Sequence, residues 1–79
     1  MVDEVLLKHV MGSILKVDPT TIGPDASNDT IEGWDSLKHM NLVLALEEEF
    51  GVSIPDEDIM NMTSYALIKL VLDELLKDR

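Results

Sequence analysis

The sequence predicts an all-α domain. Apolar residues recur at helical spacing in three long segments, residues 3–16, 36–50 and 64–77. Pro55 and the three acidic residues after it predict a short additional helix that ends near Met62. No segment shows the alternation of polar and apolar residues that is typical of a half-buried strand. A chain of 79 residues has room for one small core, so residues 1–79 are interpreted as a single domain.

The first predicted helix has a signal at each end. Asp3 is a suitable N-cap, and Glu4 supplies the negative charge that a helix N-terminus favours. Because Pro19 disfavours helix in the residue before it, Val17, Asp18 and Pro19 are predicted to end the helix. The expected apolar face of this helix consists of Val5, Leu6, His9, Val10, Ile14 and Leu15.

A long connection, residues 17–35, follows the first helix. Small polar residues fill it, and its turns are marked by Pro19, Gly23, Pro24 and Gly33. Loops of this length are uncommon in compact domains and are often functional. The apolar residues expected to hold the loop against the helices are Ile22, Ile31 and Trp34.

The other two long helices also have recognisable ends. Asp35 or Ser36 is the predicted N-cap of the second helix, and Gly51 is its predicted stop. Thr63 or Ser64 is the predicted N-cap of the last helix. The apolar face of the last helix is expected to contain Tyr65, Leu67, Ile68, Val71, Leu72 and Leu75.

Composition and charge limit the possible functions. The chain has no cysteine, which excludes disulfides, cysteine-ligated zinc and thiol catalysis by the chain itself. Its net charge of −10 repels nucleic acid and anionic membranes and favours partners with basic patches, although a well-solvated surface would carry the same charge. Neither a signal segment nor an apolar run of spanning length is evident, so the expected location is the cytoplasm, without membrane insertion.

The second long helix carries two apolar stripes on a helical wheel of about 100° per residue. The first is typical of a core contact and contains Leu42, Val43, Leu46 and Phe50. The second begins beside Ser36 and contains Leu37, Met40 and Leu44, with Glu47 and Glu48 beyond them. An exposed apolar patch with a charged rim is typical of a docking site. Alternatively, the loop of residues 17–35 folds over the second stripe and buries it.

Ser36 occupies a position where negative charge is favoured. Free backbone N–H groups and the helix dipole would stabilise a phosphodiester on its hydroxyl oxygen. The alternative is that Ser36 is only an N-cap, because serine is common at that position.

Several runs of residues surround Ser36. They are Asp35-Ser36-Leu37, Leu42-Val43-Leu44-Ala45-Leu46-Glu47-Glu48-Glu49-Phe50 and Ile54-Pro55-Asp56-Glu57, with Pro24-Asp25-Ala26-Ser27 upstream. Together they resemble the acyl carrier proteins of fatty acid and polyketide synthesis, over nearly the whole chain. The Asp-Ser-Leu run is a weak signal alone, but its combination with this helix and the Ile-Pro-Asp-Glu turn is highly specific.

The resemblance implies a four-helix bundle with a long loop between its first two helices. It also implies a covalent 4′-phosphopantetheine arm on Ser36, flanked by Asp35 and Leu37. A phosphopantetheinyl transferase would attach this arm from coenzyme A. Because the thiol of the arm would carry acyl groups as thioesters, the protein is expected to be a non-catalytic, monomeric carrier and not an enzyme.

The same resemblance makes the helix that begins at Ser36 the main recognition helix. Its expected partners are acyl-transferring and acyl-modifying enzymes with basic docking patches. The residues expected to contact them are Leu37, Lys38, Met40, Asn41, Leu44, Glu47 and Glu48. The acyl chain is expected to fold back between the helices, where the cavity residues would be His39, Leu46 and Phe50.

Two positions depart from the pattern of fatty-acid carriers, which commonly have acidic residues two and five positions after the modified serine. This chain has Lys38 and Asn41 there, so negative charge is removed from the head of the docking helix. Partner choice is sensitive to the sign of charge. Together with Trp34, which is not the usual residue of housekeeping carriers, these changes favour a specialised member of the family.

The histidines and the acidic loop do not predict a catalytic or metal-binding site. His39 and His9 are interpreted as partly buried, hydrogen-bonded side chains, and two distant histidines without cysteine do not predict a metal site. Ser36 and His39 lie on adjacent turns without a third group to orient the histidine, so nucleophilic catalysis is not expected. The acidic loop from Asp25 to Ser36 lacks the glycine and glutamate that a calcium loop requires.

Three functions therefore remain open. The first is an acyl carrier for fatty acid, polyketide or specialised lipid biosynthesis. The second is an aminoacyl or peptidyl carrier that uses the same arm. The third is an unmodified, acidic helical adaptor that binds a basic partner.

Overall fold

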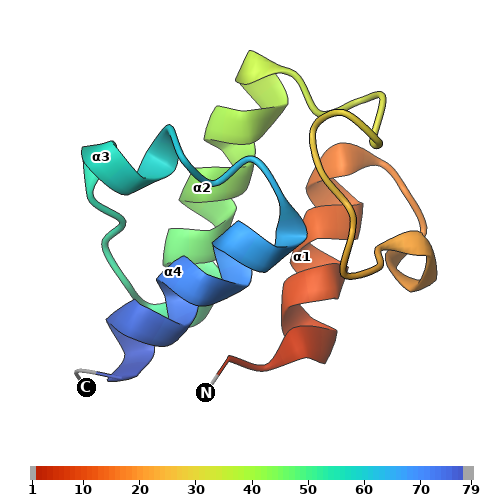
Figure 1. Ribbon diagram of the computed structural model, residues 1–79. Helices are drawn as coiled ribbons and strands as arrows, with labels where there is room; N and C mark the ends of the chain where they lie inside the picture. The colour runs from red at the N-terminus through yellow and green to blue at the C-terminus, as the bar shows by residue number, and fades with distance from the viewer. Residues whose placement is uncertain (1, 78–79) are drawn as a thin grey trace.

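The computed structural model describes residues 2–77 and confirms the all-α prediction. Its helices are α1 (Glu4–Leu15), α2 (Ser36–Phe50), α3 (Asp56–Ile59) and α4 (Tyr65–Lys77). Figure 1 shows α1, α2 and α4 gathered into one bundle, with the short α3 along one edge. In this view α2 begins at the top, whereas α1 begins and α4 ends at the bottom. The start of α2 is therefore at the opposite end of the bundle from the start of α1 and the end of α4.

The boundaries of α1 are set by Asp3 and Lys16. The Asp3 carboxylate accepts a hydrogen bond from the Leu6 N–H at 3.1 Å, as predicted for an N-cap. The helix ends at Lys16, whose left-handed backbone (φ 62°) turns the chain so that the Val17 N–H donates to the Gly12 carbonyl at 3.1 Å. The helix thus ends just before Val17, Asp18 and Pro19, as predicted, and Pro19 begins a 3₁₀ turn, η1 (Pro19–Thr21), that was not predicted from the sequence.

The buried face of α1 differs from the predicted one. Its buried residues are Leu7, Val10, Met11, Gly12 and Leu15. Val5 is 82% exposed and His9 is exposed, so the prediction that His9 is partly buried was wrong. The cause is that α1 carries two overlapping apolar stripes, and only packing against α2 and α4 selects between them.

The core consists mainly of aliphatic and methionine side chains, and its buried aromatic residues are Trp34 and Tyr65. Its fully buried members are Leu7, Met11, Ile22, Leu42, Val43, Leu46, Met62, Ile68 and Leu72. The predicted core stripe of α2 is confirmed, with Phe50 partly buried at its end. On α4 the predicted apolar face is correct except for Leu67, which is 40% exposed.

The long loop is attached to the bundle by buried side chains and by backbone hydrogen bonds. Ile22 and Trp34 are buried, as predicted, and Ile31 is partly buried. The Tyr65 N–H donates to the Ala26 carbonyl at 2.8 Å, next to an isolated antiparallel bridge between Ser27 and Ser64. The loop thus pairs with the segment that precedes α4. Ser64 also caps α4, because its hydroxyl accepts from the Leu67 N–H at 3.2 Å.

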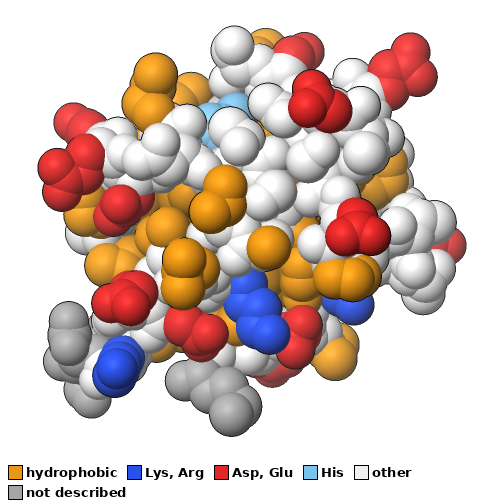
Figure 2. Space-filling model, in the orientation of Figure 1, with side chains coloured by type: hydrophobic (Ala, Val, Ile, Leu, Met, Phe, Trp, Pro, Cys, Tyr) orange, Lys and Arg blue, Asp and Glu red, His pale blue; other side chains and the backbone are white. Residues whose placement is uncertain are grey.

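Charge is unevenly distributed over the surface. Figure 2 shows acidic side chains around one face of the molecule, while the lysines of that face lie in its lower half. Within residues 2–77, no helix has the length and the hydropathy needed to cross a bilayer.

A polar contact joins α1 to α4. The Tyr65 hydroxyl donates to Glu4 Oε1 at 2.7 Å, and Lys69 Nζ lies 3.3 Å from Glu4 Oε2. The Tyr65 hydrogen bond and then the Lys69 contact lower the pKa of the Glu4 carboxyl, because both favour its ionised form. Burial and the same hydrogen bond raise the pKa of the Tyr65 hydroxyl.

Replacing Tyr65 by phenylalanine is expected to raise the pKa of the Glu4 carboxyl toward its ordinary value, because its main donor is lost. In the wild type this carboxylate stabilises the fold above its unfolded-state pKa. That contribution is lost as the pH falls through the lowered pKa of the folded state. An NMR titration of the Glu4 side chain in both proteins measures the change. An unchanged titration curve in Y65F would contradict this account.

Candidate functional site

The start of α2 is organised by Asp35. Its carboxylate accepts from the Lys38 N–H at 2.8 Å, so Asp35 is the N-cap and Ser36 is the first helical residue. The alternative that Ser36 is itself the cap is therefore wrong. Within residues 2–77 the exposed Ser36 side chain makes no hydrogen bond, and the N–H groups of Ser36 and Leu37 have no acceptor. The hydroxyl and two backbone donors are thus free at one helix end.

An apolar patch lies next to Ser36 on the surface of α2. Leu37 is 70% exposed, Met40 is 47% exposed and Leu44 is 60% exposed. The long loop does not cover these residues, so the alternative that it buries them is wrong. Met60, which follows α3, is 79% exposed and was not predicted from the sequence, because a helix of one turn has no periodicity to assign its faces.

A cavity of about 430 Å³ opens beside Ser36. Its lining residues come from the long loop, α2, α3 and the segment after α3. They are Asn28, Trp34, Asp35, Ser36, His39, Met40, Ile59, Met60 and Thr63. The lining combines apolar side chains with polar ones, so it can accept a chain of methylene and amide groups.

His39 is a partly buried side chain with both ring nitrogens in hydrogen bonds, as predicted. Trp34 Nε1 donates to His39 Nδ1 at 3.0 Å, and His39 Nε2 lies 2.7 Å from the Ile59 carbonyl oxygen. Neither nitrogen is therefore free to accept the Ser36 proton. This arrangement lacks the serine–histidine hydrogen bond that nucleophilic catalysis needs.

The remaining predicted partner-contact residues differ in exposure. Asn41 and Glu48 are exposed, and Lys38 is partly exposed without an ion-pair partner among residues 2–77. Glu47 is partly buried because its Oε2 accepts from the Ile54 N–H at 2.7 Å. That bond holds the segment before α3 against the end of α2 and occupies one oxygen of the Glu47 carboxylate, whereas Glu48 is exposed.

The two cavity residues predicted further along α2 lie deeper in the bundle. Leu46 is fully buried and Phe50 is partly buried in the same core. Neither lines the cavity beside Ser36. The structure therefore places only His39 of the three predicted cavity residues at that cavity.

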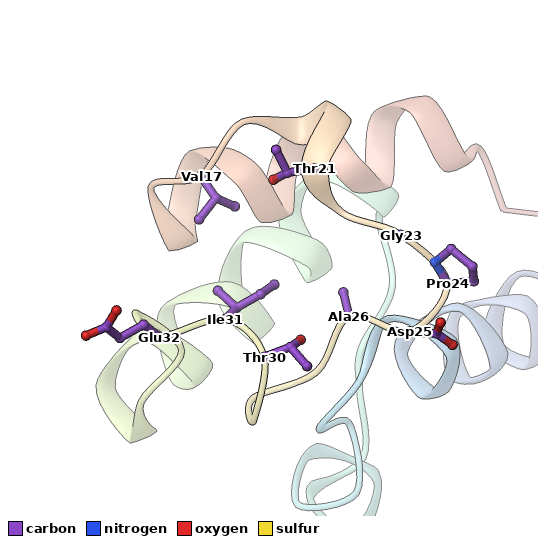
Figure 3. Close-up of a pocket in the computed structure, with 9 residues that line it drawn as sticks. All are labelled: Val17, Thr21, Gly23, Pro24, Asp25, Ala26, Thr30, Ile31 and Glu32. Atoms are coloured by element: carbon purple, nitrogen blue, oxygen red, sulfur yellow. The ribbon is translucent and has the colours of Figure 1, made fainter.

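A second cavity, of about 440 Å³, lies within the long loop. Figure 3 shows Val17, Thr21, Ala26 and Ile31 converging across it, with Glu32 at its margin. It shares no lining residue with the cavity beside Ser36 and contains no histidine or lysine. The described part of the chain holds no group of three His, Asp or Glu side chains arranged to bind a metal ion. Unlike this second cavity, the cavity beside Ser36 combines an exposed hydroxyl with a histidine ring.

Comparison with known proteins decides the family. The model of a family described as "Phosphopantetheine attachment site" matches residues 5–71. An acyl carrier protein of Syntrophobacter fumaroxidans is 37% identical over 76 residues, which are 96% of this chain and 90% of that protein. The chain belongs to the acyl carrier protein family. Phosphopantetheine is the prosthetic group of this family.

Two further acyl carrier proteins match over part of their length. One, of Thermosynechococcus vestitus, is 46% identical over 52 residues, which are 66% of this chain and 64% of that protein. The other, acyl carrier protein 2, mitochondrial, of Arabidopsis thaliana, is 42% identical over 65 residues, which are 82% of this chain and 50% of that protein. The chain thus spans between half and two thirds of these two relatives.

The fold of an acyl carrier protein is confirmed by a solved structure. The solution NMR structure of holo acyl carrier protein from Geobacter metallireducens aligns with a TM-score of 0.85 and 22% identity. The alignment covers 99% of this chain and 90% of that chain. The four-helix bundle with a long first loop, implied by the resemblance, is therefore correct.

The start of α2 fits a phosphopantetheine group. The Ser36 hydroxyl is exposed and makes no hydrogen bond to any residue from 2 to 77, and the Asp35 carboxylate accepts from the Lys38 N–H. The free N–H groups of Ser36 and Leu37 can donate to phosphate oxygens. The cavity beside Ser36 can take the methylene and amide groups that follow the phosphate.

Proposed function

We propose that this chain is an acyl carrier protein that bears its phosphopantetheine arm on Ser36. The observation that supports this most is the exposed Ser36 hydroxyl at the start of α2, which no described residue bonds and which lies between the apolar patch and the cavity. Asp35 would position the helix end, and the N–H groups of Ser36 and Leu37 would stabilise the phosphodiester. Residues 1–79 would function as one carrier domain.

Attachment forms a bond from Ser36 Oγ to the phosphorus of the pantetheine phosphate of coenzyme A. The bond from that phosphorus to the bridging oxygen breaks, adenosine bisphosphate leaves, and the serine proton is lost to a base of the transferase. The attached group supplies a thiol that forms thioesters with acyl groups, which the cysteine-free chain itself lacks. The chain contributes position and recognition, while partner enzymes perform the chemistry.

The partners are proposed to be a phosphopantetheinyl transferase and enzymes that transfer or modify acyl groups. Leu37, Met40 and Leu44 form an apolar contact surface beside the arm. Glu48 and the negative charge of the whole chain favour basic patches on these enzymes. No nucleic acid or membrane surface is proposed as a partner. A monomer and a cytoplasmic location remain predictions from the sequence.

The pathway is proposed to be a specialised one. Lys38 places a positive charge two residues after Ser36, and Asn41 is neutral on the next turn. A housekeeping enzyme that meets a fatty-acid carrier through basic residues would be repelled by Lys38.

Changing Lys38 to Asp together with Asn41 to Glu is expected to raise kcat/KM with a housekeeping ketosynthase by about two- to tenfold at low salt. An effect of this size is typical of a few exposed charges at the edge of a protein–protein interface. K77D combined with A66E is the matched control, because it changes the net charge equally on α4. The control should leave kcat/KM near the wild-type value. Equal or lower turnover of the α2 double variant would contradict the proposed specialisation.

The carrier function is tested by loading. The purified chain is incubated with coenzyme A and a broad-specificity transferase, then with enzymes that load fatty acyl, malonyl or aminoacyl groups. Intact mass is expected to show one arm and then one acyl group that hydroxylamine releases. Preferential aminoacyl loading would favour a peptidyl carrier. A folded chain that gains no mass would favour an unmodified adaptor and overturn the proposal.

A further inference from the structure

Beside Ser36, the ring of His39 joins three parts of the molecule. Trp34 in the long loop donates to Nδ1 of His39 in α2 at 3.0 Å. Nε2 of the same ring lies 2.7 Å from the carbonyl oxygen of Ile59 in α3. One side chain thus connects the long loop, α2 and α3 through two hydrogen bonds, which we call the His39 bridge.

The partners fix the protonation of the ring. The Trp34 indole nitrogen can only donate, so His39 Nδ1 is unprotonated. The Ile59 carbonyl can only accept, so Nε2 carries the proton and the ring is neutral. The Trp34 and His39 rings also stack, with centroids 6.2 Å apart and an interplanar angle of 23°. The orientation of His39 is therefore defined by both neighbouring segments.

The His39 bridge stands between the cavity and the core of the bundle. His39, Val43, Leu46 and Phe50 follow one another at i, i+4, i+7 and i+11 on α2, so they share one face. His39 is the member nearest Ser36 and lines the cavity there, whereas Leu46 is fully buried. An arm attached at Ser36, with its acyl chain directed between α2 and α3, would meet the His39 bridge before the acyl chain reached Leu46.

We propose that His39 is a positioning residue that holds α3 on α2 and limits how far a cargo enters the bundle. This inference rests on the proposed carrier function. With the bridge formed, the cavity beside Ser36 accommodates the arm and a short acyl group, and a longer acyl chain stays outside the core. Admission of a longer chain requires α3 to leave the His39 ring, which breaks the bond to the Ile59 carbonyl.

The expected preference is therefore for short acyl groups. Removing the His39 ring abolishes both hydrogen bonds of the bridge, and the net loss of one ordinary hydrogen bond shifts an equilibrium by about fivefold. W34F keeps an aromatic ring in the loop but removes the donor to Nδ1. It should loosen the bridge without removing the His39 contact to α3.

Thioester protection tests this inference. Wild type, H39A, W34F and the control H9A are each loaded with butyryl and octanoyl arms by a transferase that accepts acyl coenzyme A. Thioester cleavage by hydroxylamine is then followed by intact mass. In wild type and H9A the octanoyl thioester should be cleaved at least as fast as the butyryl thioester, because the longer chain stays outside the core. In H39A octanoyl cleavage should slow by about fivefold or more while butyryl cleavage is unchanged, with a smaller effect in W34F.

The possible failures are distinguishable. A folded protein that accepts no arm overturns the carrier function itself. If all four loaded proteins show the same ratio of octanoyl to butyryl cleavage, the carrier function stands and the inference about His39 is wrong. Strong octanoyl protection in wild type also overturns it. Nitrogen NMR of the wild-type His39 ring should show a protonated Nε2 and an unprotonated Nδ1, and the opposite tautomer would contradict the bridge.

Discussion

Replacing Ser36 by alanine is expected to abolish attachment of the phosphopantetheine arm while leaving the fold intact. The Ser36 side chain is exposed and makes no hydrogen bond within residues 2–77, and the cap of α2 is Asp35. Alanine is the best helix former, so S36A should have a free energy of unfolding within about 0.5 kcal/mol of wild type. Intact mass after incubation with coenzyme A and a transferase measures the loss.

The control for this variant is S53A. Ser53 is also exposed, but it lies in the segment between α2 and α3, where no helix begins. S53A should be modified as completely as wild type. Modification of S36A, with its circular dichroism unchanged, would show that another hydroxyl bears the arm and would contradict the assignment of the site.

Leu42→Ala is expected to cause the largest loss of stability. Leu42 is fully buried on the core face of α2. Shortening a buried leucine typically costs about 2–5 kcal/mol, through lost burial and the cavity left behind. A domain of 79 residues has a total stability of about 4–12 kcal/mol at ordinary values per residue. Urea unfolding of wild type and L42A measures the difference.

The matched control is Leu44→Ala, two residues away on the same helix. Leu44 is 60% exposed, so its shortening should change the free energy of unfolding by about 0.5 kcal/mol or less. L44A should instead weaken partner binding, because Leu44 belongs to the proposed docking patch. If L42A and L44A were equally stable, the assignment of the two faces of α2 would be wrong.

The architecture of α2 was predictable because its signals are local. Asp35, one of the two predicted N-caps, caps it, and Gly51 ends it with a left-handed backbone (φ 64°) as predicted. Its two apolar stripes were also separable by spacing alone. The structure adds the exposure of the second stripe, which spacing could not decide, because covering by a loop depends on contacts distant in sequence.

The buried face of α1 was not predictable by the same method. Apolar residues surround much of this helix, so Val5 and Leu7 compete as core residues on periodicity alone. Leu7 is buried and Val5 is exposed because α2 and α4 pack against one side. The His39 bridge was likewise not predictable from the sequence, because Trp34 and Ile59 contact His39 only when the long loop and α3 are packed on α2.

The candidate site was also only partly predictable from neighbouring residues in the sequence. Asp35, Ser36 and Leu37 are adjacent in sequence, and their chemistry follows from the start of a helix. The cavity beside them requires Asn28, Met60 and their neighbours from other segments, so the fold had to be known to find it.

Fragmentation mass spectrometry of the wild-type chain, after incubation with coenzyme A and a transferase, tests the central claim most directly. The proposed function predicts one phosphopantetheine group, located on Ser36, on a chain that keeps its helical circular dichroism. A group located on any other residue, or a folded chain that remains unmodified, would contradict it.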